Sequence, residues 1–132
     1  MPELLTNLLQ ERLNNYRPPP DLTVSGWAEA ERYLSSEASA EAGKWHNARN
    51  PMLVEPMDAL SPHDPCERVV CKFSSQVGKT EIGLNFAGYQ MDQDPGPMLI
   101  VQPTKMPMGE TFAKDRIQPM LRDTPALATK FQ

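Results

Sequence analysis

The sequence has few cysteines, no long apolar run and no excess of basic residues, and each of these absences excludes some classes of protein. It contains only two cysteines, Cys66 and Cys71, and their C-x4-C spacing has no second pair. This pattern does not match a zinc site and favours two ordinary thiols in a reducing compartment. No apolar run approaches the roughly 20 residues that a membrane span requires, and no apolar leader follows Met1. We therefore expect a cytosolic protein without a membrane segment.

An excess of basic residues is also lacking. The chain carries 13 Lys and Arg against 17 Asp and Glu, a net charge of −4, which argues against a surface that binds nucleic acid over its whole extent. The C-terminal third is locally basic, and its cations suit a DNA-contacting face and a mixed-charge helix surface equally well. These cations are Lys105, Lys114, Arg116, Arg122 and Lys130.

The remaining composition is that of a globular domain. Apolar residues make up 39% and charged residues 23% of the 132 residues, which is enough for one domain with its own core. The 14 prolines predict many chain breaks and a loop-rich N-terminal half.

The N-terminal half predicts short helices. Leucines at helical spacing predict an amphipathic helix over residues 2–16, whose apolar stripe must dock on another surface, and the proline run of residues 17–21 ends it. A second helix is expected over Gly26–Leu34, with Ser25 as its N-cap. A third short helix fits Met52–Leu60.

The C-terminal half predicts alternating strands and helices. Two short apolar runs, Arg68–Phe73 and Met98–Gln102, read as buried strands. Helical periodicity follows each run, over Gly78–Met91 and over 106–123, where Pro119 predicts a kink or a stop. The fold class is therefore α/β, a βαβα unit with two parallel strands and a right-handed crossover. We expect an N-terminal helix and linker over 1–20, a helical lead-in over 21–65 and the βαβα unit over 66–132.

The stretch "VVCKFSSQVGKT" carries the clearest motif. Its end, Gly78-Lys79-Thr80, matches the end of the phosphate-binding signature G-x-x-x-x-G-K-[ST], but Phe73 stands where the first glycine belongs. The predicted context fits, because a loop between a strand and a helix N-terminus turns backbone N–H groups toward a phosphate. The alternative is an ordinary helix start capped by Thr80, which leaves the small polar composition of the loop unexplained.

Several blocks together resemble the large terminase subunit of tailed bacteriophages, of the GpA type. They are "LTVSGWAEAERYLSSEASAEAGKW", "ARNPMLVEPMDALS", "VVCKFSSQVGKTE" and "MLIVQPTKMPMGETFAKDRIQPMLRDTP". They occur in the order of the family and cover nearly everything from Leu22 to Pro125. The resemblance implies a P-loop NTPase fold and an ATP-driven motor that packages viral DNA.

The resemblance also implies roles for particular residues. Lys79 would contact the transferred phosphate, Thr80 would ligate Mg²⁺, and Arg116 would sense or stabilise phosphate charge in its own subunit or in a ring neighbour. A salt bridge of Arg116 with Glu110, Asp115 or Asp123 is an equally good reading of that residue. Met52 stands where many relatives carry an aromatic residue beside the adenine. The remaining ATP-binding residues would be Ser74, Ser75, Gln76, Val77 and Gly78.

No apolar strand ending in Asp-Glu occurs in the sequence, so the Walker B carboxylates that such an ATPase needs are not found. We expect the front part of the motor, inactive by itself, with a thin sheet whose edge is open. The resemblance implies double-stranded DNA, a small terminase subunit and a portal protein as partners, a possible homo-oligomeric ring, and a place in the host cytoplasm. The alternatives are a superfamily 2 helicase-like translocase and a non-catalytic nucleotide-binding or assembly module.

Overall fold

Helices make up most of the regular structure of this computed structural model, which describes residues 1–103 and 108–131. The α-helices are α1 (Pro2–Asn15), α2 (Val24–Glu31), α3 (Val54–Ala59), α4 (Lys79–Gln93), α5 (Glu110–Phe112), α6 (Gln118–Asp123) and α7 (Pro125–Ala128). Short 3-10 turns are η1 (Asn47–Arg49) and η2 (Pro51–Leu53), and η4 (Ala113–Ile117) is a π-helical segment. Strands β1 (Tyr33–Leu34) and β2 (Gly43–Lys44) pair antiparallel, with Tyr33 opposite Lys44.

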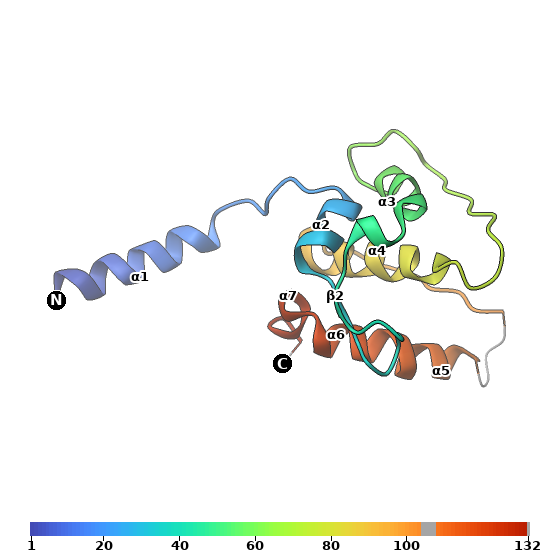
Figure 1. The fold of residues 1–132 in the computed structure, drawn as a ribbon. Coiled ribbons are helices and arrows are strands. Elements are labelled where there is room, and N and C mark those ends of the chain that lie inside the picture. The colour runs from blue at the N-terminus through green and yellow to red at the C-terminus, as the bar shows by residue number, and fades with distance from the viewer. Residues whose placement is uncertain (104–107, 132) are drawn as a thin grey trace.

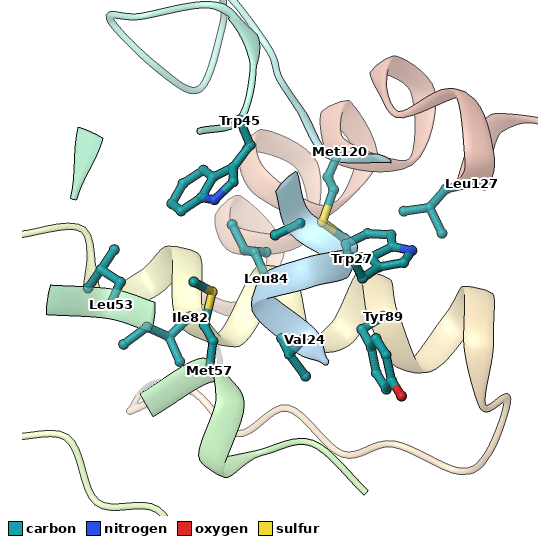
Figure 2. Packing of buried hydrophobic residues seen from close by; sticks show 11 residues of the cluster. Val24, Trp27, Trp45, Leu53, Met57, Ile82, Leu84, Tyr89, Met120 and Leu127 are labelled. Carbon is teal, nitrogen blue, oxygen red and sulfur yellow. The ribbon is translucent and has the colours of Figure 1, made fainter. Parts of the chain in front are cut away.

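Helix α4 is the centre of the packed body. Helices α2 and α3 cover one side of it, and α6 and α7 cover another, as Figure 1 shows. Because α4 is enclosed in this way, it buries residues on more than one face, including Ile82, Leu84 and Tyr89. The buried apolar side chains form one core cluster, in which the indole ring of Trp27 has Met120 and Leu127 beside it (Figure 2).

The expected second helix begins and ends earlier than the sequence indicated. Its N-cap is Thr23, whose hydroxyl oxygen accepts a hydrogen bond from the Gly26 amide at 3.1 Å. Ser25, the predicted cap, instead donates to the Asp58 carboxylate and so ties α2 to α3. After Glu31 the chain becomes extended and forms β1 rather than a last helical turn.

The two expected parallel strands are not formed by the described residues. Segments 68–73 and 98–102 have no regular secondary structure, and neither pairs with a neighbouring strand. Val70, Leu99 and Val101 expose 82%, 87% and 77% of their surface, so these residues are not the buried strands that the apolar runs predicted. A strand is stabilised by its ladder partners, and these segments have none here. The described part is compatible with a fragment of an α/β domain, but the βαβα unit is not confirmed.

The other helix predictions hold in outline. Helix α4 confirms the expectation over Gly78–Met91, and η2 with α3 confirms the one over Met52–Leu60. Pro119 does not stop its helix, which runs from Glu110 to Asp123 through the π-helical segment η4. The π-helical segment ends at Ile117, just before Pro119. Its wider turn accommodates the loss of the helical hydrogen bond that proline, which has no N–H, cannot donate. The first residues of the predicted helix and Lys105 lie outside the described residues.

The N-terminal helix forms as predicted, but it docks on nothing that the structure describes. Helix α1 extends away from the body, and a segment that contains three prolines connects the two (Figure 1). Leu4, Leu5, Leu8, Leu9 and Leu13 are each at least 49% exposed. In the described ranges, no helix is both long and apolar enough to cross a membrane.

Candidate phosphate-binding site

The loop that precedes α4 has an unusual backbone conformation. Gln76 and Gly78 both have positive φ, at 58° and 85°, and Gly78 is the residue from which α4 begins. Gln76 is the one non-glycine residue with positive φ among those described, so the loop takes a path that most side chains disfavour. The Glu81 N–H donates to the Gly78 carbonyl at 2.9 Å. The N–H groups of Lys79 and Thr80 come before it in the first turn, where a helix leaves its donors without partners further back in the helix.

Asn50 anchors this loop from behind. Its side-chain amide donates a 2.8 Å hydrogen bond to the Val77 carbonyl. A side chain at Gly78 would come within 3.4 Å of both Asn50 Nδ2 and Leu53 Cδ1, so the segment around η2 lies directly against the loop. The sequence pointed to this segment only through its family resemblance, and it did not single out Asn50.

The predicted loop residues lie on the surface. Ser74, Ser75 and Gln76 are exposed, as are Lys79 and Thr80, while Val77 and Gly78 are half-buried against the Asn50 side. Among the described residues, Lys79 makes no ion pair, so its ammonium group can reach a ligand without first breaking a contact. Met52 is 56% exposed on η2.

Two pockets flank the loop. The first, which we name the Lys79 pocket, has a volume of about 430 Å³ and brings Lys79 and Thr80 together with Arg116. Its wall also includes Ile100 and Gln102, which come shortly before residue 104 in the chain. The second, the Trp45 pocket, has a volume of about 460 Å³ and lies on the other side of the loop, where Gln76, Val77 and Gly78 face Trp45, Asn50 and Leu53. Met52 is not among its lining residues.

Arg116 is therefore a predicted site residue, distant in sequence, that the fold brings to the same pocket as Lys79 and Thr80. It lies on η4, and in Figure 1 the neighbouring α5 and the beginning of α4 reach the same side of the molecule. Its Nη1 donates a 2.7 Å hydrogen bond to the Ala38 carbonyl and lies 4.0 Å from Glu81 Oε1. In the described ranges, Glu110, Asp115 and Asp123 form no ion pair with Arg116, so the three partners considered from sequence are replaced by Glu81.

Glu81 also contacts a second, buried arginine that the sequence did not single out. Arg32 Nη2 lies 3.1 Å from Glu81 Oε2, and its Nε donates to Asn85 Oδ1 at 3.1 Å. Burial lowers the pKa of Arg32, and the Glu81 carboxylate acts in the opposite direction. The first turn of α4 is thereby fixed to the end of α2.

Comparison with known proteins identifies the family of the chain. The family model of the phage terminase large subunit gpA, ATPase domain, matches residues 39–132. The chain belongs to this family. The matched range contains the whole loop, Asn50 and Arg116, whereas α1 and α2 lie before it.

A relative from a well-known phage supports the same assignment. The terminase large subunit of Escherichia phage lambda is 31% identical over 112 residues, which are 85% of this chain and 17% of that protein. The chain thus spans about a sixth of the length of this terminase relative. No solved structure matches the chain. Membership of the terminase family does not favour the helicase-like translocase that the sequence left as an alternative.

Proposed function

We propose that this chain is the part of a phage terminase large subunit that holds the phosphates of ATP. The observation that carries the proposal is the Lys79 pocket at the beginning of α4, where a lysine, a threonine hydroxyl and an arginine converge beside a loop of positive φ. Backbone N–H groups, a helix dipole and fixed cations are what a triphosphate requires.

In this proposal each group has a distinct task. Lys79 contacts the transferred phosphate as a point charge, and Arg116 donates its planar N–H groups to the terminal phosphate. Ser74, Ser75, Gln76, Val77 and Gly78 form the cradle with their backbone and small side chains. The adenine of ATP lies on the side of the Trp45 pocket, because there Asn50 holds the segment around η2 against the loop. A contact from Met52 rests on the family resemblance alone.

Mg²⁺ fits this site only together with the nucleotide. The described residues contain no group of three or more His, Cys, Asp or Glu side chains that could hold a metal ion. Thr80 would hold the ion with one hydroxyl, and the phosphate oxygens would supply further ligands. When bound, the ion would neutralise charge that develops on the phosphates.

We propose that the complete protein couples ATP hydrolysis to the movement of double-stranded DNA into a capsid. Its βαβα sheet would have segments 68–73 and 98–102 as its first two strands. Hydrolysis would also need Walker B carboxylates, which are not found in this sequence. Partners would be the small terminase subunit and the portal, in a homo-oligomeric ring in the host cytoplasm. By itself the chain would bind ATP without hydrolysing it.

A thermal-shift series tests the binding claim. Mg-ATP is expected to raise the unfolding midpoint of the chain, because a ligand that binds only the native state stabilises it. Lys79→Ala should abolish this shift without lowering the midpoint of the ligand-free chain, since Lys79 is exposed. No shift for the unmodified chain would refute the proposed cradle, and measurable hydrolysis would refute the claim that the chain only binds.

A further inference from the structure

The Glu81 carboxylate lies beside two arginines that come from different elements, Arg32 from the end of α2 and Arg116 from η4. Its Oε2 is 3.1 Å from Arg32 Nη2, and its Oε1 is 4.0 Å from Arg116 Nη1. Only 16% of the Glu81 side chain is exposed. One carboxylate in the first turn of α4 thus faces one guanidinium behind the site and another within it.

Arg32 is the fixed partner of the two. Its side chain is 4% exposed, and it also donates to the Tyr33 carbonyl and to Asn85 Oδ1. Asn85 is fully buried and donates in turn to Met57 Sδ at 3.4 Å. A buried guanidinium that loses its carboxylate is left with an uncompensated charge, so Arg32 holds Glu81 in one place.

Arg116 is the adjustable partner. Its side chain is 41% exposed, and a separation of 4.0 Å from Glu81 makes a weak ion pair. The hydrogen bond to the Ala38 carbonyl occupies Nη1, while the guanidinium has five N–H donors in all. Donors therefore remain for a ligand in the Lys79 pocket while Glu81 and Ala38 keep the group in place.

We propose that Glu81 is a positioning residue, which Arg32 holds and which aims Arg116 at the terminal phosphate of ATP. This inference rests on the proposed function of the same site. The two guanidinium groups outweigh the single carboxylate, so the cluster stays positive and does not repel a phosphate. Restricting Arg116 before the ligand arrives lowers the entropy cost of the contact.

A double-mutant cycle on the 132-residue chain tests this role, with dissociation constants for Mg-ATP and Mg-ADP as the readout. Arg116→Ala should reduce the preference for ATP over ADP by about tenfold, the loss of one strong charge-assisted contact. Glu81→Gln should reduce the same preference by about threefold and leave ADP binding unchanged. The double variant should lose no more than Arg116→Ala, because Glu81 acts only through Arg116.

Two further variants keep the test decisive. Glu81→Asp keeps a negative charge near the buried Arg32 but shortens the side chain, which lengthens the 4.0 Å separation from Arg116, and it should reduce the ATP preference in the same direction. Glu55→Gln makes the same charge change at an exposed position of α3 and should alter neither constant. Equal losses of ATP and ADP binding in the Glu81 variants, or losses that multiply with those of Arg116→Ala, would overturn the positioning role.

A measurement without nucleotide separates this inference from the proposed function. The NMR signal of the Arg116 Nε–H group in the ligand-free chain should shift in Glu81→Asp and remain unchanged in Glu55→Gln. An unchanged signal in Glu81→Asp would overturn the inference even if ATP binds. Conversely, a shifted signal together with nucleotide affinity that Lys79→Ala leaves intact would refute the phosphate cradle and not the contact between Glu81 and Arg116.

Discussion

The indole ring of Trp27 lies so close to Gly88 that no other residue fits at that position of α4. A Cβ atom on Gly88 would stand 2.4 Å from Trp27 Cη2 and 2.8 Å from Cζ3. Real Cβ contacts are never this short, and Trp27 is wholly buried, with its Nε1 donating to Asp92 at 2.8 Å. The ring therefore cannot move aside without losing that hydrogen bond.

Gly88→Ala is accordingly predicted to destabilise the chain by about 1–3 kcal/mol, the usual cost of overpacking a core. Gly83→Ala is the matched control, since it lies in the same helix and a Cβ there meets nothing within 4 Å. That variant should gain up to about 1 kcal/mol from helix propensity. Chemical denaturation of both variants checks the prediction, and equal stability of the two would contradict the packing described for Trp27.

Asp92 makes the stability of this core depend on pH. Burial acts to raise its pKa, but hydrogen bonds from Lys130, Gln93 and Trp27 together hold that pKa below the ordinary value of 3.8. The native state thus binds this proton less tightly than the unfolded chain does. The stabilisation is present above pH 3.8 and is lost as the pH falls through the native pKa.

Asp92→Asn should therefore lower the free energy of unfolding at neutral pH by about 1 kcal/mol, the size of a hydrogen-bond contribution. It should also make the loss of stability below pH 4 shallower. Asp94→Asn, at an exposed position two residues away, should leave the pH profile unchanged. Denaturation curves recorded between pH 3 and 7 give the free energy of unfolding of each variant as a function of pH. Parallel profiles for Asp92→Asn and the unmodified chain would exclude the role given to this carboxylate.

The hydrogen bond from Asn50 to Val77 predicts that the loop loses its shape without that donor. Asn50→Asp replaces the amide nitrogen by an oxygen of the same size, which faces the Val77 carbonyl without a proton. We expect Mg-ATP affinity to fall by about fivefold to tenfold, because about 1 kcal/mol of anchoring is lost. Calorimetric titration measures this, and unaltered affinity would show that the loop holds its shape without Asn50.

None of the described side chains of helix α1 is buried, so removal of the helix should not affect the body. Deleting residues 1–20 is expected to leave the thermal midpoint within about 2 °C, which corresponds to less than 1 kcal/mol. The helical signal should fall by no more than the share of α1, since an isolated helix of 14 residues is marginal in water and is only partly formed. Circular dichroism of the two chains compares them. A large drop in the midpoint would mean that the five leucines cover part of the body in solution.

Local patterns were sufficient to predict α1, α4 and the position of the loop. Helical periodicity located α1 and α4, and the motif at Gly78 located the beginning of α4. The cap of α2 was misplaced because Thr23 and Ser25 are equally suitable by type, and only the distant Asp58 decides which of them caps.

The remaining differences depend on contacts between distant residues. Strand formation at 68–73 and 98–102 requires partners, which a local apolar run does not reveal. The anchoring of the loop by Asn50 and the pairing of Glu81 with Arg32 join residues far apart in sequence. The one distant site residue that was identified, Arg116, was found through the family resemblance, and the fold brings it to the Lys79 pocket.

Calorimetric titration of Mg-ATP into the chain and two lysine variants tests the central claim most directly. Lys79→Ala removes the cation at the beginning of α4, and Lys72→Ala removes an exposed lysine just before the loop with the same change in charge. We predict that Lys79→Ala weakens binding at least about tenfold, as expected for a lost charge-assisted contact, while Lys72→Ala stays within about twofold. Equal affinity for the two variants would contradict the assignment of this loop as the phosphate cradle.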